Sequence, residues 1–147
     1  MADFYDVKTY NPRESLGYLL TMVRRRLLDL VEPEFAALGL TPVQAIILMG
    51  LDAGVAGTAA DLCKTMQHDP GAMTRVLDQL EQAGLLRRVR LAGDRRAQKL
   101  ELTAAGRKAL PAIKAAAVHG SNRMLSGFSR SDAQQLIGYL KRLLEVT

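Results

Sequence analysis

Apolar residues recur every third or fourth position along most of this chain, a spacing that predicts amphipathic helices. The first helix is expected over residues 13–31, after an N-terminal arm of a dozen residues without such periodicity. Pro33 disturbs the pattern, so the helix is expected to bend or restart there. The last helix follows Ser129, where leucine and isoleucine again fall on one face. Both terminal helices have broad apolar faces without an obvious partner in a chain of 147 residues, so we expect a second copy to cover them.

Side chains that can cap a helix mark where the remaining helices begin. Each is a Ser, Thr or Asp whose oxygen can accept a hydrogen bond from the first helical turn, and two of them precede a proline. Two others have an Asp three residues later, the spacing of a capping box. The N-cap residues predicted in this way are Thr41, Thr58, Asp69, Thr103 and Ser129.

Two short strands are expected between the helices, over residues 86–90 and 97–102, joined by the tight turn at residues 92–94. Gly84 suits the position that ends the preceding helix. A helix from Thr103 to about Ser126 follows, with a kink expected at Pro111. The predicted order is four helices, two strands and two helices, which gives a mainly α fold with a small β-hairpin.

The net charge of +5 is confined to one third of the chain. Residues 64–108 contain ten Lys and Arg against five Asp and Glu, whereas the rest of the chain contains ten of each. Such a concentration of positive charge favours a polyanionic partner. The chain has a single cysteine, which excludes an internal disulfide framework and suits a reducing compartment.

The helix that begins after Asp69 is the candidate for reading DNA. Its apolar stripe faces inward, so Thr74, Arg75 and Gln79 project outward, where they can enter a major groove. Arg75 can pair with guanine or phosphate, Gln79 can read adenine, and Thr74 can contact a phosphate or a thymine methyl group. Asp69 and Pro70 place the helix N-terminus, whose free N–H groups favour an anion such as phosphate. The alternative is that Arg75 and Gln79 are ordinary solvated residues.

The hairpin tip clusters Arg95 and Arg96 on one small turn, which costs repulsion and makes a purely structural role a poor explanation. Arginine gains from the negative potential of a narrow minor groove. Asp94 beside them is expected to orient an arginine through a side-chain pair. The arginines of the first strand can contact the DNA backbone, or they can form a solvated face. These strand residues are Arg87, Arg88 and Arg90.

Two stretches carry a family resemblance: DPGAMTRVLDQLEQAGLLRR, and DRRAQKLELTAAG after it. They resemble the multiple antibiotic resistance regulator (MarR) family of bacterial winged-helix transcription factors. The Asp94-Arg95-Arg96 pattern, followed by the Leu102-Thr103 junction and Gly106, is fairly specific to this family. The order of helices extends the resemblance over residues 13–146.

The resemblance implies a homodimer whose terminal helices form the dimer interface and whose two recognition helices and wings bind a palindromic operator. It also implies a transcriptional regulator, expected to be a repressor, that responds to a small, often aromatic or anionic ligand. The wing arginine that enters the minor groove would be Arg95 or Arg96. We accordingly expect residues 35–103 to form a winged helix-turn-helix domain, and residues 1–34 and 104–147 to form a helical dimerisation region.

A ligand pocket is harder to place from the sequence. One group of candidates shares a side of the first helix, a second lies one turn apart on the long helix after the hairpin, and a histidine precedes the recognition helix. Their arginines can pair with a carboxylate. An interface or surface role is equally compatible with the pattern. The candidates are Tyr18, Met22, Arg25, His68, His119 and Arg123.

Other chemistry finds little support in the sequence. Cys63 lies beside Leu62 and Met66, where a buried core cysteine is a better explanation than a redox sensor. The two histidines lack the spacing of a metal site. We therefore expect no metal, no cofactor and no catalytic residues. The chain also lacks a long apolar run and a signal-peptide pattern, so a cytoplasmic protein without membrane contact is expected.

Two alternatives from other functional classes remain open at this point. One is an architectural DNA-binding protein without sequence preference. The other is a winged-helix module that binds proteins and no nucleic acid, although the basic hairpin tip argues against it.

Overall fold

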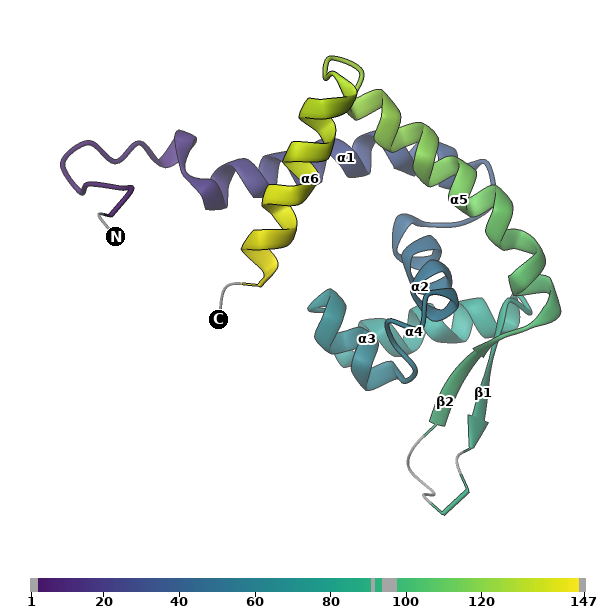
Figure 1. Ribbon diagram of the computed structural model, residues 1–147. Helices are drawn as coiled ribbons and strands as arrows, with labels where there is room; N and C mark the ends of the chain where they lie inside the picture. Colours follow the sequence, from purple (N-terminus) through teal and green to yellow (C-terminus); the bar gives the residue numbers. More distant parts are fainter. Residues whose placement is uncertain (1–2, 91, 94–97, 146–147) are drawn as a thin grey trace.

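Figure 1 shows the computed structural model of the chain, which describes residues 3–90, 92–93 and 98–145. Within these residues the elements follow the predicted order of four helices, two strands and two helices, with a short 3-10 turn before the first helix. The mainly α fold class with one hairpin is thereby confirmed. The elements are η1 (Pro12–Glu14), α1 (Leu16–Ala36), α2 (Pro42–Asp52), α3 (Ala59–Met66), α4 (Pro70–Gln82), β1 (Leu86–Arg90), β2 (Gln98–Leu102), α5 (Ala104–Met124) and α6 (Arg130–Leu144).

All five predicted N-cap residues begin a helix, and the side chain of each accepts a hydrogen bond from a backbone N–H of the first turn. The start of α3 shows the chemistry most fully. The carboxylate of Asp61 accepts from the N–H groups of Gly57 at 3.1 Å and Thr58 at 2.9 Å. These bonds, the one from Gly57 first, hold the pKa of Asp61 below its ordinary value because they favour the ionised form.

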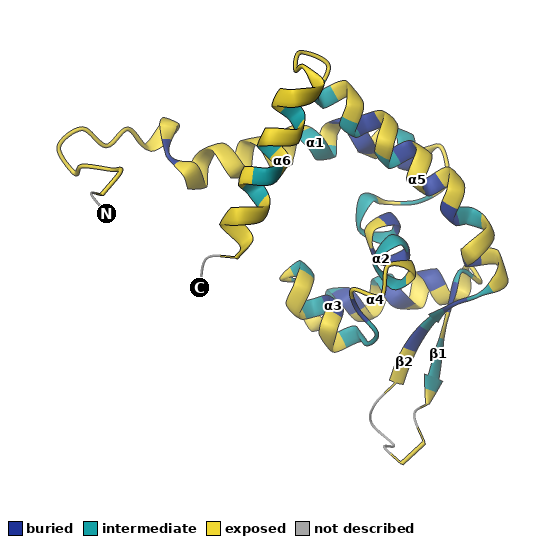
Figure 2. Cartoon of the chain, viewed as in Figure 1, coloured by how far each residue is buried: buried dark blue, intermediate teal, exposed yellow. Residues whose placement is uncertain are grey.

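The helices α2, α3 and α4 pack with the hairpin around one apolar core, seen as the dark residues in Figure 2. Leu48, Met73 and Leu77 are completely buried there. Burying a side chain of this size stabilises a fold by about 1.5–3 kcal/mol. β1 and β2 are antiparallel, and the pair Leu86 and Leu102 at their base is buried. The hairpin is therefore anchored at its base, while its strands run outward from the core (Figure 1).

Both long helices continue through an internal proline. α1 does not stop at Pro33 but extends to Ala36, and Val31 and Phe35 on either side of the proline are buried. The packing of these side chains offsets the hydrogen bond that proline cannot donate. α5 likewise continues past Pro111, and Figure 1 shows it curving along its length.

α1 and α5 lie side by side above the core (Figure 1). Gly120 makes their close approach possible, because a Cβ atom at this position would lie 2.4 Å from Cγ1 of Val31. A second close approach joins α5 to the hairpin. A Cβ at Gly106 would lie 2.0 Å from the carbonyl oxygen of Leu85, and the Thr103 N–H donates to that same oxygen at 3.1 Å. The start of α5 is therefore fixed to the base of the hairpin.

The two ends of the chain are mostly exposed, as the yellow segments of Figure 2 show, and many of their exposed residues have large apolar side chains. The first half of α1 contacts little of the rest of the chain, and α6 contains no buried residue along its described length. The exposed apolar residues of these two helices are Leu16, Tyr18, Leu19, Leu20, Met22, Val23, Ile137, Tyr139, Leu143 and Leu144. Among the described residues, no helix is long and apolar enough to cross a membrane.

Candidate nucleic-acid interface

α3 and α4 are joined by a tight turn. Gln67 adopts the left-handed conformation, with φ 49° and ψ 45°, and ends α3. Two residues later the carboxylate of Asp69 caps α4 by accepting from the Ala72 N–H at 2.9 Å. A short helix, a tight turn and a second helix are the parts of a helix-turn-helix, in which the second helix enters the major groove. Asp69 and Pro70 thus place the start of α4 as predicted, although the carboxylate itself occupies one of the free N–H groups.

α4 has one buried face and one open face. Met73, Leu77 and Leu80 are buried in the core, which leaves Thr74 and Arg75 exposed on the opposite side. The hydroxyl of Thr74 donates to the carbonyl of Pro70 at 2.9 Å, so its lone pairs and methyl group remain available to a partner. Arg75 forms no ion pair within the described part of the chain.

Arg87 lies on the face of the hairpin that points away from α4. It stands opposite Glu101 in the strand register, and its Nη2 donates to the Glu101 carboxylate at 2.9 Å. Lys99 adds a longer contact of 3.5 Å to the same carboxylate. The hydrogen bond from Arg87, followed by that from Lys99, lowers the pKa of Glu101, although partial desolvation opposes the shift. Arg87 is thus a cross-strand partner whose side chain remains 62% exposed.

Arg88 lies on the other face and joins the hairpin to α4. Its guanidinium donates to Asp78 at 2.7 Å and forms an ion pair with Glu81, and its backbone N–H donates to Glu81 at 3.1 Å. Burial alone would lower the pKa of Arg88, but its hydrogen bonds to the carboxylates of Asp78 and Glu81 outweigh this effect, so the pKa is raised. The guanidinium of Arg88 already has two carboxylate partners, and its side chain is only 19% exposed. Arg88 is therefore not placed to make the predicted contact with the DNA backbone.

Arg90 ends β1 and is exposed, and it forms no ion pair with another described residue. It follows that Arg75 and Arg90 are the arginines of α4 and β1 whose guanidinium groups are available in the described structure. The predicted wing residues Asp94, Arg95 and Arg96 lie outside the described residues.

Gln44 is a candidate that the sequence analysis missed. Its side chain completes the capping box at the start of α2 by accepting from the Thr41 N–H at 2.9 Å. The nitrogen of the same amide donates to Oε1 of Gln79 on α4 at 3.2 Å. The signal was present in the sequence, because Thr41 and Gln44 have the spacing of a capping box. The contact with Gln79, however, depends on how α2 packs against α4.

The predicted ligand residues do not form one site within a single chain. Tyr18, Met22 and Arg25 lie on the open first half of α1, whereas His68 is half-buried between α3 and α4. Cys63, expected in the core, is half-buried and packs against it.

His119 and Arg123 do converge, but on a carboxylate of the protein itself. Nδ1 of His119 lies 2.9 Å from Oε1 of Glu34 on α1, and the guanidinium of Arg123 lies 4.0 Å from the same oxygen. These two candidates therefore link α5 to α1 in the single chain.

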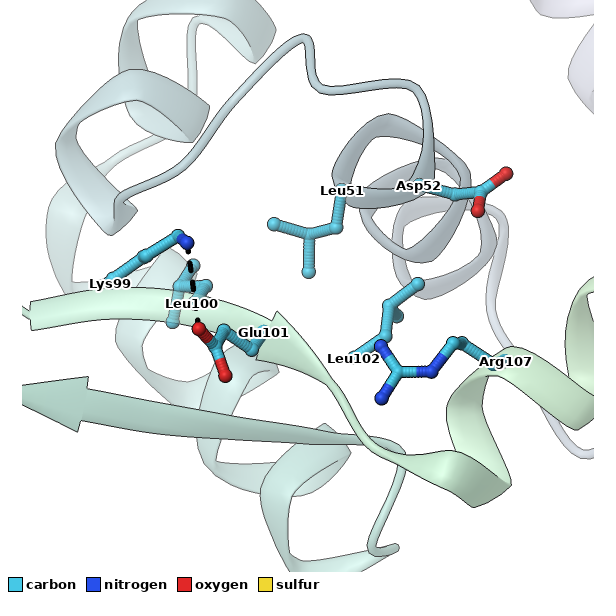
Figure 3. Close-up of a pocket in the computed structure, with 7 residues that line it drawn as sticks. All are labelled: Leu51, Asp52, Lys99, Leu100, Glu101, Leu102 and Arg107. Atoms are coloured by element: carbon cyan, nitrogen blue, oxygen red, sulfur yellow. Dashed lines mark ion pairs between the residues drawn. The ribbon is translucent and has the colours of Figure 1, made fainter.

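A pocket of about 370 Å³ opens between α2, β2 and the start of α5 (Figure 3). Leu51, Leu100 and Leu102 provide its apolar walls, and Arg107 directs its guanidinium toward Leu102. The pocket contains carboxylates as well as cations: Lys99 pairs with Glu101 inside it, and Asp52 pairs with Lys114 at 2.7 Å. Among the described residues, no group of three or more histidine, cysteine or acidic side chains could hold a metal ion.

Comparison with known proteins shows which family and which solved structures this chain resembles. The MarR family model matches residues 38–97, which include α2, α3, α4 and β1. A MarR family protein of Mycobacterium tuberculosis, in complex with salicylic acid, is 28% identical with a TM-score of 0.77, and the match covers 93% of this chain and 99% of that chain. A probable transcriptional regulator from Pseudomonas aeruginosa is 27% identical with a TM-score of 0.76, covering 90% and 99%.

A mutant of E. coli MarR complexed with operator DNA shares the fold, with a TM-score of 0.78 at 24% identity over 92% of this chain and 98% of that chain. The helix-turn-helix and the first strand of the hairpin thus lie within the match to the family model, and the flanking helices agree with the solved structures. Over residues 38–97 this chain is similar to the MarR family, and its fold is that of solved MarR family structures.

Proposed function

We propose that this protein is a homodimeric repressor that binds a palindromic operator and releases it when a small aromatic or anionic ligand binds. The observation that carries the proposal is the open face of α4, where Thr74 and Arg75 are exposed next to a hairpin that Arg88 fixes to the same helix. The exposed face of α4 and the hairpin attached to it support a surface in which α4 reads the major groove and the hairpin acts as the wing. The E. coli MarR complex with operator DNA supports the same use of the fold.

The uncovered apolar faces support the dimer. The first half of α1 and the whole of α6 expose leucine, valine, isoleucine and tyrosine side chains that a second copy can bury (Figure 2). Two copies related by a dyad would present two α4 helices to half-sites about one helical turn, roughly 10 bp, apart. We retain the division into a DNA-binding domain, residues 35–103, and a helical dimerisation region, residues 1–34 and 104–147, as part of this proposal.

Within the DNA-binding surface we assign distinct roles. Thr74, Arg75 and Gln79 contact the major groove, while Asp69 and Pro70 set the position of the helix start. Arg90 contacts the DNA backbone. Arg87 and Arg88 make the wing more rigid through their ion pairs, Arg87 with Glu101 and Arg88 with Asp78. Arg95 or Arg96 enters the minor groove and Asp94 orients it, as the family resemblance implies.

The first test is a gel shift with genomic fragments, comparing the wild type with Arg75→Ala. If Arg75 pairs with a base, its loss should cost about 1–3 kcal/mol of binding free energy and relax specificity at that position. Lys108→Ala, which removes an exposed cation at the start of α5 outside α4 and outside the uncovered apolar faces, is the control for charge. Equal affinity of the wild type and Arg75→Ala for the protected fragments would overturn the role of α4.

Footprinting on the same fragments separates the regulator from an architectural DNA-binding protein. A regulator should protect discrete palindromes, whereas a protein without sequence preference should protect none. A protein-interaction module would give no shift on any fragment, even at low salt.

The effector is proposed from chemistry and from the relative bound to salicylic acid. Tyr18, Met22 and Arg25 lie where a second copy would cover them, so a ligand there would contact both chains. The pocket of Figure 3 offers Arg107 as a second place for a carboxylate. A thermal-shift titration with salicylic acid, followed by a gel shift, tests the response. If salicylic acid no longer raises the unfolding temperature of Arg25→Ala but still raises that of Arg107→Ala, the ligand binds on α1. The reverse result would locate the ligand beside β2.

A further inference from the structure

We propose that Gln44 is a positioning residue that decides which end of the Gln79 amide faces the DNA, and thereby which base α4 prefers. The inference rests on the proposed function, because it concerns how the same surface reads its operator. It begins from the two hydrogen bonds that join Thr41, Gln44 and Gln79 across α2 and α4.

The first bond fixes the orientation of the Gln44 amide. A backbone N–H can only donate, so the group 2.9 Å from the Thr41 nitrogen must be the Gln44 oxygen. The Gln44 nitrogen then occupies the opposite end of the amide. The capping box therefore orients a side chain that would otherwise be free to present either end.

The second bond transmits this orientation to α4. The Gln44 nitrogen can only donate, so the group it meets at 3.2 Å is the oxygen of Gln79. The Gln79 nitrogen, with its two N–H groups, is left as the free end. Gln79 is exposed on α4, one turn beyond Arg75, and its amide nitrogen forms no hydrogen bond with another described residue.

A free amide nitrogen selects bases by what they present in the major groove. Guanine offers two acceptors there, N7 and O6, and thymine offers O4. Adenine is best read by an amide whose nitrogen donates to N7 while its oxygen accepts from N6. The bond from Gln44 uses one of the two lone pairs of the Gln79 oxygen and directs that oxygen toward α2, which disfavours this two-point pairing. Cytosine offers only a donor. Gln44 thus changes the expected preference of Gln79 from adenine to guanine or thymine.

The substitution Gln44→Glu isolates this effect. The introduced carboxylate can still accept from the Thr41 N–H, so the capping box is retained. It cannot donate to Gln79, and its second oxygen should instead accept from the Gln79 nitrogen. The amide of Gln79 would then turn around and present its oxygen, which favours the donor of adenine or cytosine.

The experiment is selection of bound sequences from a randomised double-stranded DNA library by the wild type, Gln44→Glu and Gln79→Ala. We expect Gln79→Ala to relax one position in each half-site, and Gln44→Glu to reverse the preference at that same position by about fivefold or more. Gln82→Glu adds the same charge to α4 and controls for repulsion, which should weaken all sequences alike. Thermal unfolding confirms that each variant folds.

The outcomes separate the two proposals. A wild-type protein that enriches no sequence would overturn the proposed function and this inference with it. An enriched palindrome that Gln44→Glu leaves unchanged, or one that Gln79→Ala does not relax, would overturn the inference alone. If Gln44→Glu does not fold, Gln44→Ala decides, because freeing the Gln79 amide should make guanine and adenine nearly equivalent at the position. An unchanged preference in that variant would equally contradict the inference.

Discussion

At the scale of single residues, the arginines of the basic segment differ in what surrounds their guanidinium groups. Arg75 is exposed without a partner in the described structure, whereas Arg88 pairs with both Asp78 and Glu81. The pairing neutralises Asp78 on the face of α4 next to the proposed DNA site, where a free carboxylate would repel phosphate. Arg88 therefore supports binding without itself being placed to contact DNA.

Replacing Arg88 by Ala should lower the free energy of unfolding by about 1 kcal/mol, because a partly buried guanidinium is lost and two half-exposed carboxylates remain unpaired. It should also weaken DNA binding without changing which sequences are preferred. Chemical denaturation and selection from a random library measure the two effects. Arg90→Ala is the control and should stay within about 0.5 kcal/mol of the wild type in stability. A changed base preference in Arg88→Ala would show that Arg88 reads DNA after all.

At the scale of elements, helix starts could be predicted from the sequence because capping is local chemistry. Thr58 and Asp61 are three residues apart, and their hydrogen bonds need nothing from the rest of the fold. The end of α1 could not be predicted in this way. Pro33 argues for a break, and the helix continues because Phe35 is buried in the core. The same distinction applies to the site: the open face of α4 follows from helical spacing, but the partners of Arg88 come from tertiary packing.

The Asp61 carboxylate should make stability depend on pH. Because its pKa is depressed in the folded chain, its stabilising effect is present above its ordinary pKa and is lost as the pH falls through the folded value. Asp61→Asn should therefore be less stable than the wild type at neutral pH, and the difference should shrink below about pH 4. Thermal unfolding of both proteins at a series of pH values checks this. A difference that stays constant down to pH 3 would contradict it.

The junction between the hairpin and α5 should tolerate no side chain larger than hydrogen. Gly106→Ala places a Cβ against the backbone oxygen of Leu85, so we expect destabilisation of about 1–3 kcal/mol from overpacking. Gly50→Ala is the matched control, since a Cβ there meets nothing within 4 Å and helix propensity should add about 0.5–1 kcal/mol. Urea unfolding of both variants measures the contrast. Equal stabilities would mean that the junction can open to admit the methyl group.

At the scale of the whole molecule, the single chain buries its central apolar core but leaves the apolar faces of α1 and α6 exposed to solvent. The apolar faces of α1 and α6 were visible in the sequence as regular leucine spacing, and the structure leaves them uncovered. What the sequence could not provide is how the two helices are placed relative to each other. That placement depends on the α1–α5 contact at Gly120 and Val31, which lie 89 positions apart in the chain.

Charged residues on the uncovered faces should prevent dimer formation. We expect Leu19→Glu combined with Leu143→Glu to give a monomer that keeps its helical content, because neither side chain belongs to the core. The monomer should lose most of its DNA affinity, because it can contact only one of the two half-sites of the operator. Leu38→Glu, exposed to a similar extent outside these faces, should remain dimeric. Sedimentation velocity distinguishes the species, and a double variant that stays dimeric would place the interface elsewhere.

The central claim, that two copies of this chain read one palindromic operator through α4, is tested most directly by the mass of the protein–DNA complex. Sedimentation equilibrium with a duplex that contains one selected palindrome should give two chains per duplex. Mutating one half-site should weaken binding while leaving that stoichiometry unchanged at saturation. A complex with one chain per duplex, or chains that accumulate in proportion to duplex length, would contradict the account.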